Sequence, residues 1–485
     1  MLSLYQFLQL PFRVITGIST LAGLFLIGIS YFFFQFARRS DTQYWVGVIF
    51  LAALGIRLCI ILFSPFTNLF VDIGMYQDMG QLVINGANPY DFNNETALRA
   101  ILRTDERAYV ASTSATQTHW NYNTSSQLPF FELFMGWIEL LYPHLYTYRL
   151  IFAWIDSLTC LCVLLIVTQN WVKPISYFFG KKIGLTNLSI NHFLIITAVA
   201  ISVVSPIFLR SGTLIPNIKG NLTFLILAAV FLSYQRLNRE RIWLSAIFLG
   251  LSVSFMALGI FVVPLILRNL YSKSVNHRAF FIDASLYITI ALFSCFFWFI
   301  PFYEGLLHMI QYRLKAGTTV PLHGSIWRFV AASTPAFWQT IKTGAIILFV
   351  LVHLVGIWRK KLSLEIITAS LFLLFVQLLT TDGSMDRLNI SLMVCVCLYG
   401  FTQQCAHSVL VPLYVLGGAL SVSVSLAVGA FEKIAGYQPF EYSLTDSVFN
   451  ALFLIVYLFL IARISWKGDI VSWTTPPINN SILTK

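Results

Sequence analysis

The sequence predicts an all-α, polytopic membrane protein with about 12–13 transmembrane helices and a large first extracytoplasmic loop. Of its 485 residues, 58% are hydrophobic and only 11% are charged. Soluble domains usually carry roughly 25% charged residues, so this composition argues against an ordinary soluble enzyme. The second observation is a series of apolar stretches separated by basic clusters, a pattern that is typical of topology signals.

Twelve apolar stretches are candidate membrane spans, although several are shorter than the roughly 20 residues that a perpendicular helix needs. They lie near residues 14–34, 44–70, 149–168, 192–209, 221–235, 242–267, 280–302, 342–358, 363–380, 388–402, 408–430 and 448–464. We find no strand-like alternation and no internal repeat between them.

The net charge of +11 is concentrated in short loops, so we interpret it as a set of orientation signals and not as a nucleic-acid-binding surface. The clusters are Arg38-Arg39, Lys173 with Lys181-Lys182, Arg236 with Arg239 and Arg241, Arg268 with Lys273 and Arg278, Arg359-Lys360-Lys361, and Arg463 with Lys467. Cytoplasmic placement of these clusters puts the N-terminus outside and the C-terminus inside. It also creates two large outer loops, at 71–148 and 303–341.

Residues 128–142 are apolar enough to count as a span, but a crossing there would move the cluster that begins at Lys173 to the outside. Glu132 and Glu139 are seven residues apart and therefore share a helix face. We expect an amphipathic helix that lies at the outer surface and does not cross.

Residues 242–267 have basic clusters on both sides and a middle rich in Gly and Ser. Both flanks can be cytoplasmic only if this stretch turns back as two half-length helices, which membrane proteins tolerate where protein covers the break. Counting both halves brings the expectation to about 13 helices.

The seven cysteines lie in or beside apolar spans, and no outer loop offers a pair, so we expect no disulfide framework. They are Cys59, Cys160, Cys162, Cys295, Cys395, Cys397 and Cys405. The histidines of the outer loops lack the spacing of metal ligands. We expect no cofactor, although a divalent metal stays open.

The most informative stretch runs from Val71 to Phe92, VDIGMYQDMGQLVINGANPYDF, directly after an apolar span. A carboxylate at the mouth of a membrane helix is costly unless it faces water or a substrate. Asp72 and Tyr76 are four residues apart and share a helix face. Gly86 and Pro89 predict the end of that helix. Asp72 is therefore a candidate catalytic base, although a helix cap is the alternative.

The expected outer face also collects candidate substrate-binding residues. Cations that stand on this face against the topological bias suit a phosphate group, because Arg and Lys donors match its oxygens. The candidates are Tyr76, Asp78, Trp120, Tyr122, Arg149, Arg210, Lys219, Arg313, Arg328 and Arg387. Trp120 and Tyr122 could instead be interfacial belt aromatics, and the cations could be ordinary surface charges.

Several blocks, taken in order, resemble the polyprenyl-phosphate-mannose-dependent mannosyltransferases of the GT-C superfamily of polytopic glycosyltransferases. The resemblance covers Arg57 to about Leu267. Its blocks are IRLCIILFSP with Arg57, the Asp72–Tyr76 block, the run Gly86-Ala87-Asn88-Pro89-Tyr90-Asp91, the turn Gln127-Leu128-Pro129-Phe130, YRLIFAWIDSLTCLCVLL with Arg149 and Asp156, Ser205-Pro206, and the hairpin at Gly250-Leu251. Ile73 and Gly74 follow Asp72 where the family often has a second acid, which weakens the case for a loop-bound metal.

The resemblance implies an enzyme of the bacterial plasma membrane with its active site outside. It would move a monosaccharide, mannose or another hexose, from a polyprenyl-phosphate carrier to an acceptor hydroxyl on a glycan, lipid or protein. Asp72 would be the base, and attack from the far side of the sugar would invert the anomeric carbon. The implied organisation is an extra N-terminal helix within 1–43, a GT-C-like catalytic membrane module at 44–302, and a variable C-terminal module at 303–485.

Two other functions remain open from the sequence. A polymerase or ligase of polyprenyl-diphosphate glycans is also polytopic and uses Arg and His in a large outer loop, for which Arg313 and His323 are candidates. A secondary transporter would carry repeats and charges at mid-membrane. Asp156 is the main acid within a span, and no repeat is present.

Overall fold

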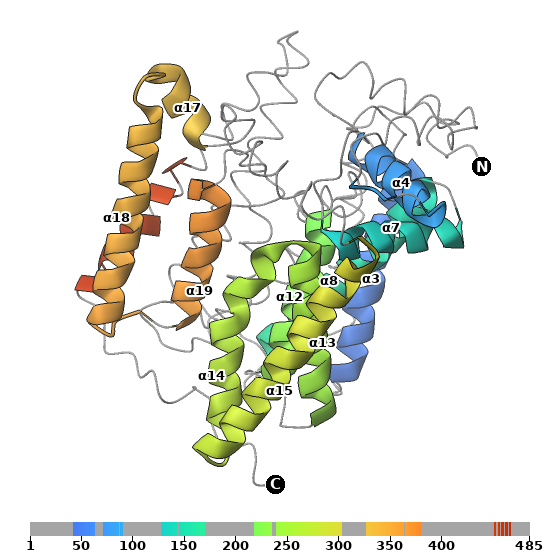
Figure 1. Cartoon of the computed structure of the whole chain (residues 1–485), viewed down its shortest axis with the longest axis horizontal. Coiled ribbons are helices and arrows are strands. Elements are labelled where there is room, and N and C mark those ends of the chain that lie inside the picture. The colour runs from blue at the N-terminus through green and yellow to red at the C-terminus, as the bar shows by residue number, and fades with distance from the viewer. Residues whose placement is uncertain are drawn as a thin grey trace, which may run out of the picture.

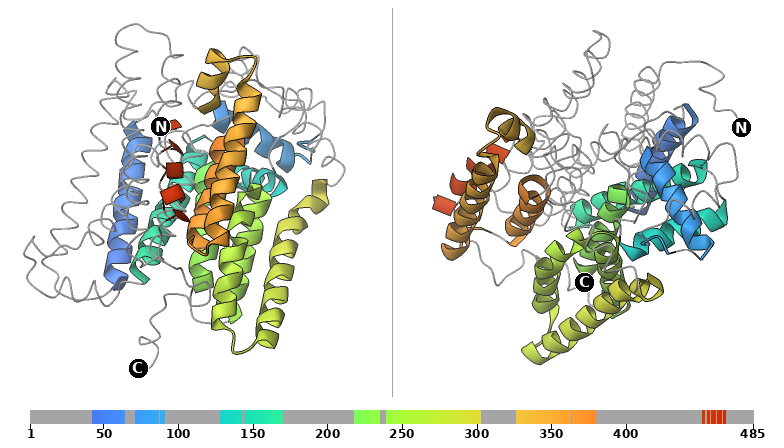
Figure 2. Two further views of the ribbon diagram at one scale, coloured as in Figure 1. Left: turned by 90° about the vertical axis from the view of Figure 1, so that its left-hand side faces the viewer. Right: turned by 45° about the horizontal axis from the view of Figure 1, so that its top comes forward.

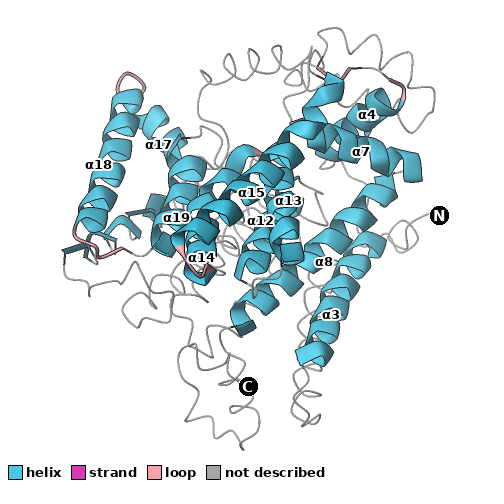
Figure 3. Cartoon of the chain, turned by 60° about the horizontal axis from the view of Figure 1, so that its bottom comes forward, coloured by secondary structure: helices cyan, strands magenta, loops and turns pink. Residues whose placement is uncertain are grey.

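The computed structural model describes residues 42–63, 71–86, 88–90, 128–142, 145–169, 218–234, 239–302, 326–362, 364–379 and most of 451–466. This part of the chain is 90% helix and contains no strand. Figure 3 colours its helices cyan. The expectation of an all-α protein is therefore confirmed over the described ranges. The helices form three groups in chain order.

The first group holds α3 (Thr42–Phe63), α4 (Val71–Ile84), α7 (Pro129–Leu141) and α8 (Leu145–Gln169). α3 and α8 pack against each other in antiparallel directions, because Ile61 near the end of α3 meets Arg149 near the start of α8. α4 and α7 pack against each other and lie at a steep angle across one end of this pair (Figures 1 and 3).

A helix is present within residues 128–142, namely α7, and its placement at the outer surface without a crossing stays a prediction. It has 13 residues, which span only about 20 Å at 1.5 Å per residue and so fall short of a hydrocarbon core about 30 Å thick. Its polarity, however, is the reverse of an ordinary surface helix. Glu132 and Glu139 are buried, whereas Trp137, Leu140 and Leu141 are exposed.

The second group is a layer of α12 (Ile218–Tyr234), α13 (Arg239–Phe255), η4 (Ala257–Val262), α14 (Val263–Lys273), α15 (His277–Phe296) and η5 (Phe297–Phe302). The expected interruption within 242–267 is present at Met256, where the backbone is extended and α13 ends. Lys273 Nζ donates to the Ser233 carbonyl at 2.6 Å, and Asn269 Nδ2 donates to Ser233 Oγ at 3.2 Å. The end of α14 therefore lies beside the end of α12, close to where α13 starts. The basic clusters before α13 and at the end of α14 thus lie at the same end of this helix layer.

The third group contains α17 (Ile326–Ser333), α18 (Trp338–Trp358), α19 (Leu364–Leu373), the π-helical turn η6 (Leu374–Leu379) and a helical segment within 451–466. These helices stand beside the second group (Figures 1 and 2). Within this group, a hydrogen bond connects α18 to α19, because His353 Nε2 of α18 lies 2.7 Å from Ser370 Oγ of α19.

Two helices of the described part are long and apolar enough to cross a membrane: His277–Ile300 and Trp338–Trp358. Only 28% and 17% of their most apolar windows are buried within the protein. The central helix of a soluble protein would be mostly buried, so these exposed apolar surfaces favour contact with lipid.

Candidate functional site

α4 begins at Val71, one residue before the candidate base, and ends where the sequence predicts. Gly86 has a φ of +75°, the left-handed conformation that glycine adopts without steric cost. Asn85 Nδ2 donates to the Gln81 carbonyl at 2.8 Å, and Asn88 Oδ1 accepts from the Tyr90 backbone N–H at 3.0 Å. The predicted helix stop after α4 is therefore confirmed.

The candidate base, Asp72, lies in the first turn of α4 and one turn before Tyr76. Asp78 lies six residues after Asp72, which rotates it by about 240° around the helix axis. The two acids therefore stand on different faces of α4. Their side chains lie outside the described part of the structure, so their chemical roles stay predictions.

Tyr76 is only 2% exposed and is packed among aromatic rings of α7 and α8. Its ring meets Phe131 edge-on at 4.8 Å between centroids and lies parallel to Phe152 at 6.4 Å. Such pairs add roughly 0.5–1.5 kcal/mol beyond the burial of their area. Tyr76 thus anchors the face of α4 that also carries Asp72, and its predicted contact with substrate stays a prediction.

Two glycines bring α4 and α7 into close contact. A Cβ atom at Gly80 would lie 2.8 Å from both Glu139 Cγ and the Met135 carbonyl oxygen. A Cβ atom at Gly136 would lie 2.8 Å from Val83 Cγ1. Since real Cβ atoms do not approach so closely, larger residues at either position would push the two helices apart.

A buried carboxylate joins three helices at this crossing. Glu139 of α7 is 2% exposed. Its Oε1 accepts a hydrogen bond from the Tyr148 hydroxyl of α8 at 2.7 Å, and its Oε2 accepts one from Gln81 Nε2 of α4. Buried polar groups are stable only when they are hydrogen-bonded, so this network fixes α4 relative to α7 and α8.

Arg149 lies at the end of α8 that faces α4 and α7, and its expected place on the extracytoplasmic side stays a prediction. It is fully buried, and its Nη1 donates to the Ile61 carbonyl of α3 at 3.5 Å. Its predicted contact with a carrier phosphate stays a prediction.

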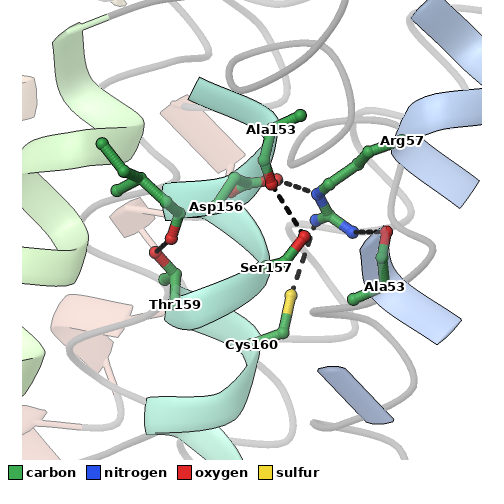
Figure 4. Close-up of polar contacts among 8 residues, drawn as sticks. Ala53, Arg57, Ala153, Asp156, Ser157, Thr159 and Cys160 are labelled. Carbon is green, nitrogen blue, oxygen red and sulfur yellow. Dashed lines mark hydrogen bonds and ion pairs between the residues drawn. The ribbon is translucent and has the colours of Figure 1, made fainter. Parts of the chain in front are cut away.

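Further along the same helix pair, Arg57 of α3 and Asp156 of α8 form a buried ion pair (Figure 4). Arg57 Nε donates to Asp156 Oδ2, Nη1 donates to the Ala53 carbonyl at 3.0 Å, and Nη2 approaches Cys160 Sγ at 3.5 Å. Arg57 is 0% and Asp156 2% exposed. Opposite charges within apolar helices persist when they are paired, so this contact ties α3 to α8.

Most of the other predicted binding residues cannot be compared with the structure. Lys219 stands in the first turn of α12 and Arg328 in α17, but their side chains lie outside the described part. Five further candidates lie wholly outside the described residues: Trp120, Tyr122, Arg210, Arg313 and Arg387.

The described residues contain no cluster of three or more His, Cys, Asp or Glu side chains that could hold a metal ion. Four of the seven cysteines fall in this part, and each carries a thiol and not a disulfide: Cys59, Cys160, Cys162 and Cys295.

Sequence reasoning identified Arg57, Asp156 and Glu139 separately but missed their partners. A signal was available for one pair, because Arg57 and Asp156 are opposite charges in the two apolar stretches that flank residues 71–148. No comparable signal pointed to Gln81 or Tyr148.

No known protein-family model matches this sequence, and no curated protein matches it at a significant level.

Proposed function

We propose that this protein is an integral membrane glycosyltransferase of the GT-C type. It transfers a monosaccharide, mannose or another hexose, from a polyprenyl-phosphate carrier to an acceptor hydroxyl on the extracytoplasmic face. The protein then spans the membrane about 12–13 times and acts in a bacterial plasma membrane. The acceptor is a glycan, a lipid or a protein.

The observation that carries this proposal is the arrangement around α4. This helix starts beside Asp72, lies across one end of the α3–α8 pair, and is held there by Tyr76 and by the Gln81–Glu139–Tyr148 network. A general base must be held within hydrogen-bond reach of the proton that it removes. A short helix that is packed against both α7 and α8 at the membrane surface would hold Asp72 in such a position.

The chemistry requires two groups. The acceptor hydroxyl is a poor nucleophile until a base removes its proton, and Asp72 is proposed for this role. The leaving group is a lipid phosphate that gains negative charge in the transition state, so nearby cations lower the barrier. Arg149, at the same end of α8, is the described cation that we propose for this second role.

The exposed apolar faces of α15 and α18 support placement in a membrane. Phe281, Ile282 and Phe293 on α15, and Leu348 and Leu351 on α18, are each more than half exposed. In water such surfaces would favour aggregation, whereas in lipid they need no partner.

The experiment is a donor panel with purified protein in nanodiscs. Radiolabelled polyprenyl-phosphate hexoses are supplied one at a time with a lipid-linked acceptor, and release of polyprenyl phosphate is measured with and without EDTA. We expect turnover with one monophosphate donor, with or without EDTA, and an inverted anomeric configuration in the product. Turnover only with polyprenyl-diphosphate glycans would instead identify a polymerase or ligase. Absence of turnover with every donor, combined with uptake into proteoliposomes, would identify a transporter.

A further inference from the structure

The end of α18 combines exposed cations with exposed tryptophans. Trp358 is 81% exposed and Trp466, on the segment within 451–466, is 69% exposed. Arg359 and Lys360 are also exposed. We call these four residues the basic–aromatic corner.

Arg359 is held in place by an aromatic ring and not by a carboxylate. Its Cζ lies 4.5 Å from the centre of a Trp466 ring, a cation–π contact. Among the described residues no acid lies within ion-pair distance of Arg359. Stacking uses the flat face of a guanidinium, so its in-plane N–H groups stay available for the oxygens of an anion.

Lys360 occupies a backbone position that favours glycine. Its φ is +53°, in the left-handed region. The Lys361 N–H donates to the Gly356 carbonyl and the Lys360 N–H donates to the Ile357 carbonyl, each at 2.9 Å. These two bonds form a Schellman helix ending, in which glycine is the usual residue at the position of Lys360. The chain thus keeps a cation where local backbone preference opposes it.

The two parts of the corner are joined by close packing. Gly356 of α18 leaves no space for a side chain, because a Cβ there would lie 2.6 Å from Leu362 Cδ1 and would also clash with Ser465 Oγ. Ser465 precedes Trp466, so this contact holds Trp466 beside the end of α18. Arg463, also exposed, stands one turn earlier on the same segment and adds positive charge.

We propose that the basic–aromatic corner binds the headgroup phosphate of an anionic phospholipid. α18 is a 21-residue candidate span, and the corner lies at its end, where tryptophans and cations meet the headgroup layer. Charge complementarity selects an anionic lipid, because cations near such a surface each contribute roughly a fivefold gain in binding. This inference requires α18 to cross a membrane, but it does not depend on the proposed transferase activity.

The sharpest test is Lys360→Gly, which should change two measurements in opposite directions. Glycine relieves the left-handed strain, so the variant should melt at a higher temperature than wild type in detergent without added lipid. It also removes a cation, so binding of phosphatidylglycerol, counted by native mass spectrometry, should weaken about fivefold. Unchanged phosphatidylglycerol binding in the variant would overturn the proposal.

Two further variants complete the experiment. Arg359→Gln combined with Lys360→Gln should weaken phosphatidylglycerol binding roughly thirtyfold. Arg278→Gln, which removes an exposed cation from the start of α15, is the matched control and should weaken binding much less than Lys360→Gly does. Equal loss in both variants would reveal only a general charge effect and overturn the site. Equal binding of phosphatidylcholine, or stabilisation by inorganic phosphate alone, would overturn the assignment to an anionic lipid.

Discussion

Breaking the buried ion pair between Arg57 and Asp156 should destabilise the fold by different amounts, depending on which partner is replaced. Asp156→Ala leaves a guanidinium fully buried among apolar helices. Arginine cannot release its proton at any accessible pH, so the charge stays. Arg57→Met leaves a carboxyl group that can take up a proton and become neutral, and methionine fills much of the vacated volume. Asp156→Ala should therefore be the more damaging change.

The magnitude follows from the burial of both groups. Removing one partner of a buried pair typically costs about 3–5 kcal/mol, because the other charge loses its compensation. Arg57 would keep only its bonds to the Ala53 carbonyl and Cys160 Sγ. We expect a loss at the upper end of this range for Asp156→Ala and a loss about 1–2 kcal/mol smaller for Arg57→Met. Arg57→Met combined with Asp156→Leu should lie within about 1 kcal/mol of wild type, because an apolar pair needs no charge compensation.

The assay is a comparison of the free energy of unfolding of the purified proteins in one detergent, with reversible unfolding followed by a method that does not require activity, such as steric trapping. The free energy of unfolding is compared among the wild type, the two single variants and the double variant. An Asp156→Ala variant within about 1 kcal/mol of wild type, or a double variant as unstable as Asp156→Ala, would refute the reasoning.

Three further predictions concern local contacts. Glu139→Gln places an amide opposite the Gln81 amide and should lower the stability of the fold by about 1–3 kcal/mol. Adding Gln81→Glu should restore most of this stability, because the hydrogen-bond donor and acceptor are then exchanged. The melting temperatures of wild type, the single variant and the double variant test this prediction. Gly80→Ala should separate α4 from α7 and cost about 1–3 kcal/mol, whereas Gly55→Ala, where no atom lies within 4 Å, should be tolerated in the same melting assay. Burial lowers the pKa of Lys273 to about 8 from an ordinary value of 10.5. The folded protein therefore binds fewer protons there than the unfolded chain, and stability should rise from about pH 8 toward 10.5, a rise that Lys273→Met should remove in melting curves.

Local features of the fold were predictable because single residues determine them. Gly86 and Pro89 predicted the end of α4, since few other residues adopt the backbone found there. The Gly- and Ser-rich stretch between two basic clusters predicted the break at Met256. The pattern of residues 128–142 also predicted a short helix, and α7 has 13 residues, whereas its placement at the membrane surface stays a prediction.

Long-range contacts were not predictable, because periodicity within one sequence carries no information about partners. Arg57 and Asp156 are 99 residues apart, and Gln81 and Glu139 are 58 residues apart. The two glutamates of α7 predicted a shared face but not its direction, which proved to be inward. A helix beside lipid can expose its apolar side and bury its polar side, the reverse of a helix in water.

The sequence predicted where the candidate residues stand along their helices, but it did not predict the contacts of their side chains. Asp72 lies in the first turn of α4, the short helix that was expected directly after the second apolar stretch. Arg149 lies near the start of α8. Tyr76 is an aromatic anchor, a role that its four-residue spacing from Asp72 did not reveal. The roles of Trp120 and Arg313 stay predictions.

The most direct test of the central claim is the rate of hexose transfer by Asp72→Asn, with Asp78→Asn as the matched control on another face of the same helix. Asparagine keeps the size and hydrogen-bonding shape of the side chain but cannot accept the proton of the acceptor hydroxyl. Positioned bases contribute roughly 100- to 10,000-fold, so Asp72→Asn should fold, bind donor and transfer sugar at least about 100-fold more slowly. Asp78→Asn should have a much milder effect, because Asp78 stands on another face of α4. A stable Asp72→Asn protein with near-normal turnover would contradict the account and identify Asp72 as a helix cap.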